Sequence, residues 1–328
     1  MVKKVKILCY GASVTAQKKQ SGYFTHLQKH FENKSNFELS KLSFGASHFD
    51  YAGYGYAKQM LEEKPDIALI DWLTPSMKKF SLDKIINLNN ELIKLGCLPI
   101  WVNFPRKDDL NCQRECYTQV KKVALKSGAI FFDLIEQLSA EKIENEYLRD
   151  IVHTTECGAE KYASKIIELI DSIVISDFEL KILPLDKPID IFSIYDIESL
   201  IDKGSPLLMK VIKTTDLSPI ELLLNTRIGP NSCFIDIEIY DESGVLIETK
   251  IINPTDPWCH YSRDMILPTV RLPYLKESYS IKLKHGGDNA LDDVKLKGEV
   301  REPLEDNKFI HIYNIACNME LEVVKNAN

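Results

Sequence analysis

Ser13, Asp150 and His153 are the residues whose types and spacing best suit catalysis. The apolar run ILCY leads to Gly11, and Ser13 stands two residues later. Asp150 lies three positions before His153, so its carboxylate can hold one imidazole nitrogen while the other takes a proton from a hydroxyl. A serine becomes a strong nucleophile only beside such an oriented base. The three residues therefore predict acyl transfer through a covalent serine ester.

The first half of the chain must bring these residues together, and its pattern predicts an α/β sheet. Short β-like runs alternate with helical stretches, which is typical of parallel strands joined by crossover helices. We expect a doubly wound, flavodoxin-like sheet of five strands, in which ligands bind beyond the carboxyl ends of the strands. Ser13, Gly45, the segment after Asp71, and Asn103 all follow such runs, so they should share one edge. The expected strands are residues 5–10, 37–44, 66–72, 98–104 and 129–134.

The pattern changes after residue 178. Prolines interrupt a connector, and β-like runs without helices follow it, with Asp-Glu-Ser-Gly at 241–244 as a hairpin turn. We expect two domains, a hydrolase-like domain over residues 1–178 and a β-sandwich-like accessory domain over residues 179–328.

Composition excludes several classes of partner. The chain has 41 Lys and Arg against 48 Asp and Glu, a net charge of -7, so we expect neither nucleic acid nor an anionic membrane as a partner. No export signal or membrane-spanning run stands out, so we expect a cytoplasmic protein whose eight cysteines are reduced thiols. Cys112 and Cys116 lack a second Cys/His pair at zinc-ligand spacing. We therefore expect no metal and no cofactor.

The motifs around the three residues resemble those of the SGNH/GDSL hydrolase family, over roughly residues 4–175. The triplet Gly-Ala-Ser ending at Ser13 is similar to the family's first block, and Asp150-Ile-Val-His153 is similar to its closing block. The resemblance implies that Ser13 is the nucleophile and that His153 is the base, oriented by Asp150. It also implies that the backbone N–H groups of Ser13 and Gly45 bind the oxyanion.

One block of this family pattern is missing. Where the resemblance calls for Gly-x-Asn-Asp after the third strand, the chain has IDWLTPS, without the asparagine that donates to the oxyanion. We consider the Asn103 amide and the Thr74 hydroxyl as replacements. Asp71 and Trp72 either line the substrate site or merely end the strand.

A loop of the second domain carries a further group of candidate binding residues. In NPTDPWCHYSRD, the residues Trp258, His260, Tyr261 and Arg263 lie close together. Aromatic rings with an arginine suit sugar binding by stacking and hydrogen bonding. The alternative is that they pack against the α/β domain.

These observations predict a serine esterase that removes O-acyl groups, in particular O-acetyl groups, from a saccharide or polysaccharide precursor. A sugar O-acyltransferase would use the same triad. A glycan-binding or assembly protein without catalytic activity is the alternative that the missing block favours.

Overall fold

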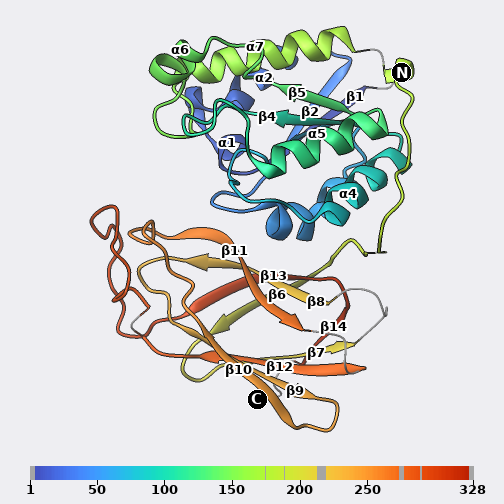
Figure 1. Cartoon of the computed structure of the whole chain (residues 1–328). Coiled ribbons are helices and arrows are strands. Elements are labelled where there is room, and N and C mark those ends of the chain that lie inside the picture. Colours follow the sequence, from blue (N-terminus) through green and yellow to red (C-terminus); the bar gives the residue numbers. More distant parts are fainter. Residues whose placement is uncertain are drawn as a thin grey trace. The chain divides into compact units, whose positions relative to one another are not determined.

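The computed structural model describes residues 4–173, 175–187, 189–212, 219–272, 277–288 and 290–324. The chain divides into two compact units, Met1–Ile189 and Asp190–Asn328 (Figure 1). Each unit has its own hydrophobic core.

The first unit contains a five-stranded parallel sheet, as the sequence predicts. Its strand order is β2-β1-β3-β4-β5. The strand that follows β1 in the chain lies on one side of it, and the three later strands lie on the other side. The carboxyl ends of β1 and β3 therefore form the switch point at which open α/β sheets bind ligands. The strands are β1 (Val5–Gly11), β2 (Phe37–Ser43), β3 (Ile67–Asp71), β4 (Leu98–Asn103) and β5 (Ile130–Asp133).

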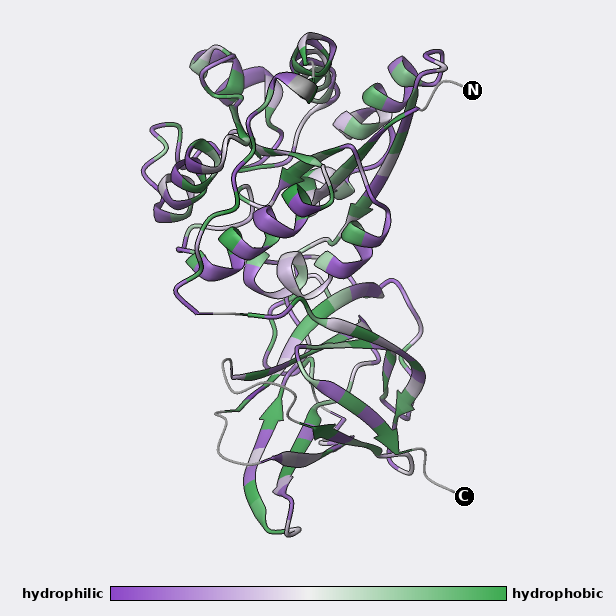
Figure 2. Cartoon of the chain, turned by 90° about the vertical axis from the view of Figure 1, so that its right-hand side faces the viewer, coloured by the Kyte–Doolittle hydropathy of each residue, from purple (hydrophilic) through white to green (hydrophobic). Residues whose placement is uncertain are grey.

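Helices cover both faces of this sheet. Ile7 and Cys9 of β1 belong to the core shared with α2 and α7, while Tyr10 points to the opposite face and donates a hydrogen bond to Gly53 O at 2.7 Å. In Figure 1, α2 and α7 lie above the sheet and α4 and α5 below it. Figure 2 shows hydrophobic and hydrophilic residues alternating along these helices, as helices with one buried side require. The α-helices are α1 (Ser13–Ala16), α2 (Tyr23–Phe31), α3 (Ala57–Glu62), α4 (Leu82–Lys94), α5 (Glu115–Ser127), α6 (Ala140–Lys142) and α7 (Glu156–Ser172), with short helical turns at Lys19–Ser21, Phe49–Gly53, Ile143–Tyr147 and Ile175–Asp177.

The connector after α7 belongs to the first unit, so the units divide later in the chain than the boundary expected after residue 178. Buried asparagines of α4 hold it in place. Asn90 exchanges two hydrogen bonds with the backbone of Leu183, at 2.8 and 2.9 Å, and Asn87 donates to Ile189 O at 3.0 Å. Backbone groups that would otherwise face apolar surface gain partners in this way.

The strands described in the second unit all pair antiparallel, as expected for the accessory domain. One sheet has the order β10-β9-β12-β7-β14 and the other β11-β8-β13-β6. The core between them draws on both sheets, and alternate residues of β9, namely Ile235, Ile237 and Ile239, point into it. The strands are β6 (Ser193–Ile201), β7 (Leu207–Ile212), β8 (Ile220–Ile228), β9 (Ile235–Asp241), β10 (Leu246–Ile252), β11 (Arg263–Leu272), β12 (Ser278–His285), β13 (Ile310–Cys317) and β14 (Glu320–Val324).

The predicted hairpin turn joins β9 to β10. Asp241 accepts hydrogen bonds from the backbone of Ser243 and Val245, both at 3.0 Å, and Gly244 has a φ of +80° that favours glycine. Among the residues that the structure describes, none of the helices combines the length and hydrophobicity needed to cross a membrane.

Candidate active site

Ser13 begins α1 directly beyond β1, at the switch point of the sheet. The turn before it is very close to β3. Ala12 N donates to Asp71 O at 3.0 Å, and a Cβ on Gly11 would lie only 2.7 Å from the same oxygen. Gly11 is therefore required by this close approach, which fixes the direction in which the chain leaves β1.

Asp150 and His153 form the hydrogen-bonded pair that their spacing predicts. His153 Nδ1 lies 2.9 Å from Asp150 Oδ2, and Asp150 Oδ1 also accepts from the backbone of Val152 at 3.0 Å and of His153 at 2.8 Å. Partial burial alone would raise the pKa of Asp150, but these hydrogen bonds outweigh burial and lower it below its ordinary value. The carboxylate is thus charged and can hold Nδ1 protonated. His153 Nε2 has no hydrogen-bond partner within the described residues.

Gln17 connects the helix of Ser13 to the histidine loop. Its Nε2 donates to Thr154 O at 3.3 Å, and its Oε1 accepts from Thr154 N at 3.2 Å and Thr154 Oγ1 at 3.1 Å. Gln17 caps the C-terminus of α1, one turn after Ser13, and Thr154 directly follows His153. The side chain of Gln17 therefore links the helix of Ser13 to the loop of His153 at the same edge of the sheet. Among the described residues, Ser13 Oγ makes no hydrogen bond, and the contact between a serine and its base is often looser in free enzymes.

Gly45 lies beside the turn of Ser13. β1 and β2 pair in parallel through Gly11 and Ser43, and Phe44 N donates to Gly11 O at 3.0 Å. A Cβ added at Gly45 would meet no atom within 4 Å, so this position faces open space. The structure thus brings Gly45 to the same strand-end edge as Ser13.

Asp71 and Trp72 are both buried, which argues against the expectation that they line the substrate site. Asp71 accepts hydrogen bonds from Thr15, at 2.8 Å, and from Thr74. Burial raises the pKa of Asp71 to about 7, although both threonine hydrogen bonds oppose the shift. Trp72 packs edge-on against Tyr10, with ring centres 5.4 Å apart. Both residues are parts of the core beneath the site.

Neither expected replacement for the third-block asparagine is a free donor. The Thr74 hydroxyl is buried and donates a hydrogen bond to Asp71 Oδ1. Asn103 is buried at the end of β4, where its Nδ2 donates to Asp133 Oδ1 at 2.9 Å and its Oδ1 accepts from Arg114 at 2.8 Å. Both groups satisfy buried partners, as polar groups in a core must, and these contacts argue against either side chain as the oxyanion donor.

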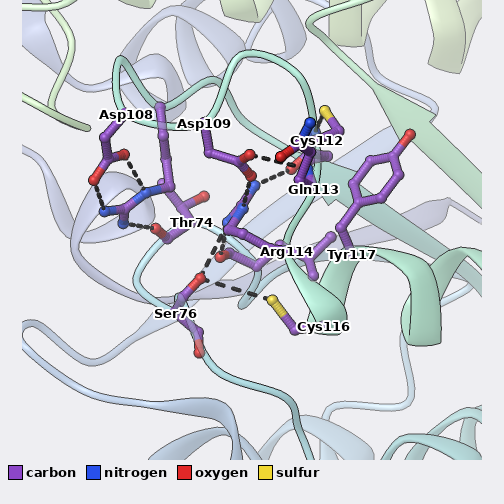
Figure 3. A network of polar contacts seen from close by, with 12 residues as sticks. Thr74, Ser76, Asp108, Asp109, Cys112, Gln113, Arg114, Cys116 and Tyr117 are labelled. Carbon is purple, nitrogen blue, oxygen red and sulfur yellow. Dashed lines mark hydrogen bonds and ion pairs between the residues drawn. The ribbon is translucent and has the colours of Figure 1, made fainter.

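Two arginines hold the loop that replaces the third block, and Figure 3 shows one of them, Arg114, beside Ser76. Arg114 is buried, pairs with Asp109, and donates from Nη1 to Leu73 O at 2.6 Å and Ser76 O at 3.2 Å. Arg106 donates to Thr74 O at 2.6 Å. Three carbonyls of this loop, those of Leu73, Thr74 and Ser76, thereby accept hydrogen bonds from guanidinium groups. Sequence reasoning missed both arginines, because a charged residue in a loop usually indicates exposure.

The two cysteines considered as metal ligands belong to the same region. Cys116 is buried with its sulfur 3.7 Å from Ser76 O. The sulfur of Cys112 lies 3.5 Å from Asn103 Nδ2, and burial raises the pKa of this thiol to about 11. Both thiols therefore stay protonated near neutral pH.

A second serine–histidine contact joins Ser76 and His48, but His48 is not oriented to accept the Ser76 proton. His48 Nδ1 accepts a hydrogen bond from Asp50 N, so the ring proton resides on Nε2, which lies 2.7 Å from Ser76 Oγ. Burial lowers the pKa of His48, which also favours this neutral form. His48 therefore donates to Ser76 and cannot take its proton.

The four candidate residues of the second unit differ in accessibility. Trp258 is 46% exposed, with Lys297 Nζ lying 4.4 Å from its ring centre. Tyr261 is half-buried beside Arg301. His260 is buried, and Arg263 pairs with Asp256, so these two hold the loop together. Of these four residues, Trp258 is the most exposed.

Comparison with known proteins finds solved structures with a similar fold. No protein-family model and no curated protein sequence matches the chain. The crystal structure of a two-domain esterase (CEX) active on acetylated mannans aligns at 10% identity with a TM-score of 0.64, covering 98% of this chain and 93% of that one. The chain has the fold of a two-domain esterase.

The same esterase co-crystallised with mannopentaose aligns at 11% identity with a TM-score of 0.65, covering 100% of this chain and 92% of that one. Both units of the present chain therefore have counterparts in one protein. The predicted five-stranded parallel sheet with an added C-terminal β domain is confirmed at the level of the fold.

Proposed function

We propose that the protein is a serine esterase that removes O-acetyl groups from a saccharide. The observation that carries this proposal is the Asp150–His153 pair, joined through Thr154 and Gln17 to the helix that begins at Ser13. The fold of an esterase active on acetylated mannans supports a saccharide ester as substrate, since both units align with it.

In the proposed reaction, Ser13 Oγ attacks the ester carbonyl carbon and its proton passes to His153 Nε2. Asp150 keeps the proton on Nδ1 and stabilises the imidazolium. The tetrahedral intermediate then releases the saccharide oxygen, which takes the proton from Nε2 and leaves acetyl-Ser13. Water attacks this ester with the same base, releasing acetate and the free serine.

The oxyanion would be held by the backbone N–H groups of Ser13 and Gly45. The side chains of Thr74 and Asn103 bond buried partners instead. The two backbone N–H groups would therefore stabilise the oxyanion without a third donor from a side chain. One such donor is worth about 10²–10³ in rate, so we expect modest turnover.

The deciding experiment is acetate release from acetylated manno-oligosaccharides by wild type and Ser13→Ala. We expect the variant to keep its fold and to lose at least ~10³-fold in turnover. Ser172→Ala removes an exposed hydroxyl at the end of α7, which bonds Leu169 O, and should leave the rate unchanged. A fluorophosphonate should add mass at Ser13 alone. Unchanged turnover of Ser13→Ala would refute the proposal.

Hydrolysis and acyl transfer use the same residues and differ in the acceptor. Adding an unacetylated oligosaccharide to the assay separates them. New acetylated product at the expense of free acetate would identify an acyltransferase.

A glycan-binding protein without catalysis is the second candidate, favoured by the absence of a free third donor. It predicts binding of manno-oligosaccharides by calorimetry but no burst with p-nitrophenyl acetate. Ser13→Ala would then bind as wild type does.

A further inference from the structure

Strand β10 is an edge strand with an unusually apolar exposed surface. It pairs with β9 on one side and stands at the end of its sheet (Figure 1). Val245, Leu246, Ile247 and Ile251, at and just before this strand, are between 46% and 64% exposed. A free edge of this kind offers unpaired backbone groups to another strand, and its apolar side chains favour covering it.

The sequence of β10 is complementary to itself when read antiparallel. If two copies pair about Thr249, Glu248 lies opposite Lys250 and Ile247 lies opposite Ile251. Each pair occurs twice because the arrangement is two-fold symmetric. We propose that β10 pairs with β10 of a second copy of this chain, extending the sheet across two molecules.

Charge selects this register. Glu248 and Lys250 pair with Ile239 and Ile237 of β9, so both lie on the side of the sheet that faces the core. Moving the two-fold axis by one residue while keeping that side puts Lys250 opposite its own copy, or Glu248 opposite its own copy. Like charges directly opposite are destabilising. The register about Thr249 is therefore the one that places opposite charges face to face.

The two charged side chains have no such partner within one molecule. Among the described residues, neither Glu248 nor Lys250 makes a hydrogen bond or an ion pair. Lys250 is half-buried, and its burial lowers its pKa while the nearby Glu248 charge opposes the shift. A second copy would supply an opposite charge to each of these side chains.

The opposite interpretation is that these features protect the edge. The pairing of β10 with β9 is irregular between Leu246 and Glu248, and inward-pointing charges are a known defence of edge strands. This interpretation predicts a monomer at every concentration, so the two can be separated by measuring self-association.

The test is sedimentation velocity of the full chain over a wide concentration range. We expect wild type to form dimers, and E248K or K250E alone to weaken dimerisation by about tenfold or more, since each places like charges opposite each other twice. Mixing the two single variants should restore association as a heterodimer, and the double variant E248K/K250E should associate as wild type does. E299K, an exposed charge change away from β10, is the matched control.

Circular dichroism of each variant checks that the fold is kept. A monomeric wild type would overturn the proposal. Dimers equally strong in all variants would place the interface elsewhere, and a mixture that fails to associate would overturn the register. The proposal concerns the second unit and stands or falls independently of esterase activity.

Discussion

The two units differ in how deeply they bury their ion pairs. In the first unit, ionisable side chains such as Asp71, Asp109 and Arg114 are buried beneath the strand-end edge and bonded to one another or to the loops. In the second unit, the core is built from aliphatic residues, and ion pairs such as Lys284 with Asp236 lie nearer the surface. The difference teaches that buried polar groups collect where loops must be held in one position. A sandwich core needs only apolar packing.

The largest effect should come from breaking the buried arginine network. Arg114→Ala leaves Asp109 as an unpaired buried charge and frees the carbonyls of Leu73 and Ser76. We expect a loss of about 3–5 kcal/mol in the free energy of unfolding of the first unit, together with lost esterase activity. Urea unfolding measures it. Lys94→Ala, which breaks an exposed pair with Glu91, is the control and should cost less than about 0.5 kcal/mol. Equal losses of unfolding free energy in Arg114→Ala and Lys94→Ala would contradict the claim that the buried ion pair matters more than the exposed one.

A core truncation in the second unit should cost nearly as much but leave the chemistry intact. Ile237→Ala opens a cavity in an apolar core and should lower the stability of that unit by about 2–5 kcal/mol. Turnover of p-nitrophenyl acetate should persist at temperatures where the first unit stays folded. Activity that falls in parallel with unfolding of the second unit would show that the two units are not independent.

The raised pKa of Asp71 should make the stability of the first unit depend on pH. The folded state keeps the Asp71 proton up to a pKa of about 7, above its ordinary value of 3.8, so this carboxyl favours the folded state in acid. Its contribution should be lost as the pH rises from about 4 to about 7, by at most about 4 kcal/mol. Asp71→Asn should remove this slope from the unfolding free energy. Thr74→Val, which removes one hydrogen bond to Asp71, is the comparison variant, and a slope that survives in Asp71→Asn would point to another group.

A substitution at Gln17 tests whether its contacts with Thr154 position Ser13 relative to His153. Gln17→Ala removes the contacts with Thr154 while leaving Ser13, Asp150 and His153 in the chain. We expect kcat to fall by about 10–100-fold with little change in KM, because the misplacement affects the reacting groups and not substrate binding. The pH at which the rate rises should stay the same, since the base is unchanged. A shift of that pH would assign Gln17 a direct electrostatic role.

The smallest effect is expected at the exposed ring of the second unit. Trp258→Ala should leave stability and turnover of a small ester unchanged, and should weaken binding of a manno-oligosaccharide by about tenfold at most if the ring contacts sugar. His260→Ala, at a buried position of the same loop, should instead destabilise the unit. Unchanged oligosaccharide binding in Trp258→Ala would remove this loop from the substrate site.

The sequence by itself determined the features that depend on short-range patterns. Alternating apolar runs indicated the five-stranded sheet and the all-β unit because side-chain periodicity follows the backbone geometry of each element. The Asp150–His153 hydrogen bond was predictable because three residues of chain allow little choice of geometry. Ser13 and Gly45 were placed at one edge because parallel strands all end there.

Only the tertiary structure decided which partners the buried polar groups take. Gln17 and Thr154 are 137 positions apart in the chain, and Arg114 reaches Leu73 across 41, distances over which no local pattern operates. Asn103 and Thr74 were expected to face a ligand, but packing placed each beside a buried carboxylate that needed a donor. A polar group buried by folding must find its partner among whatever the packed elements bring near, and that choice is made in three dimensions.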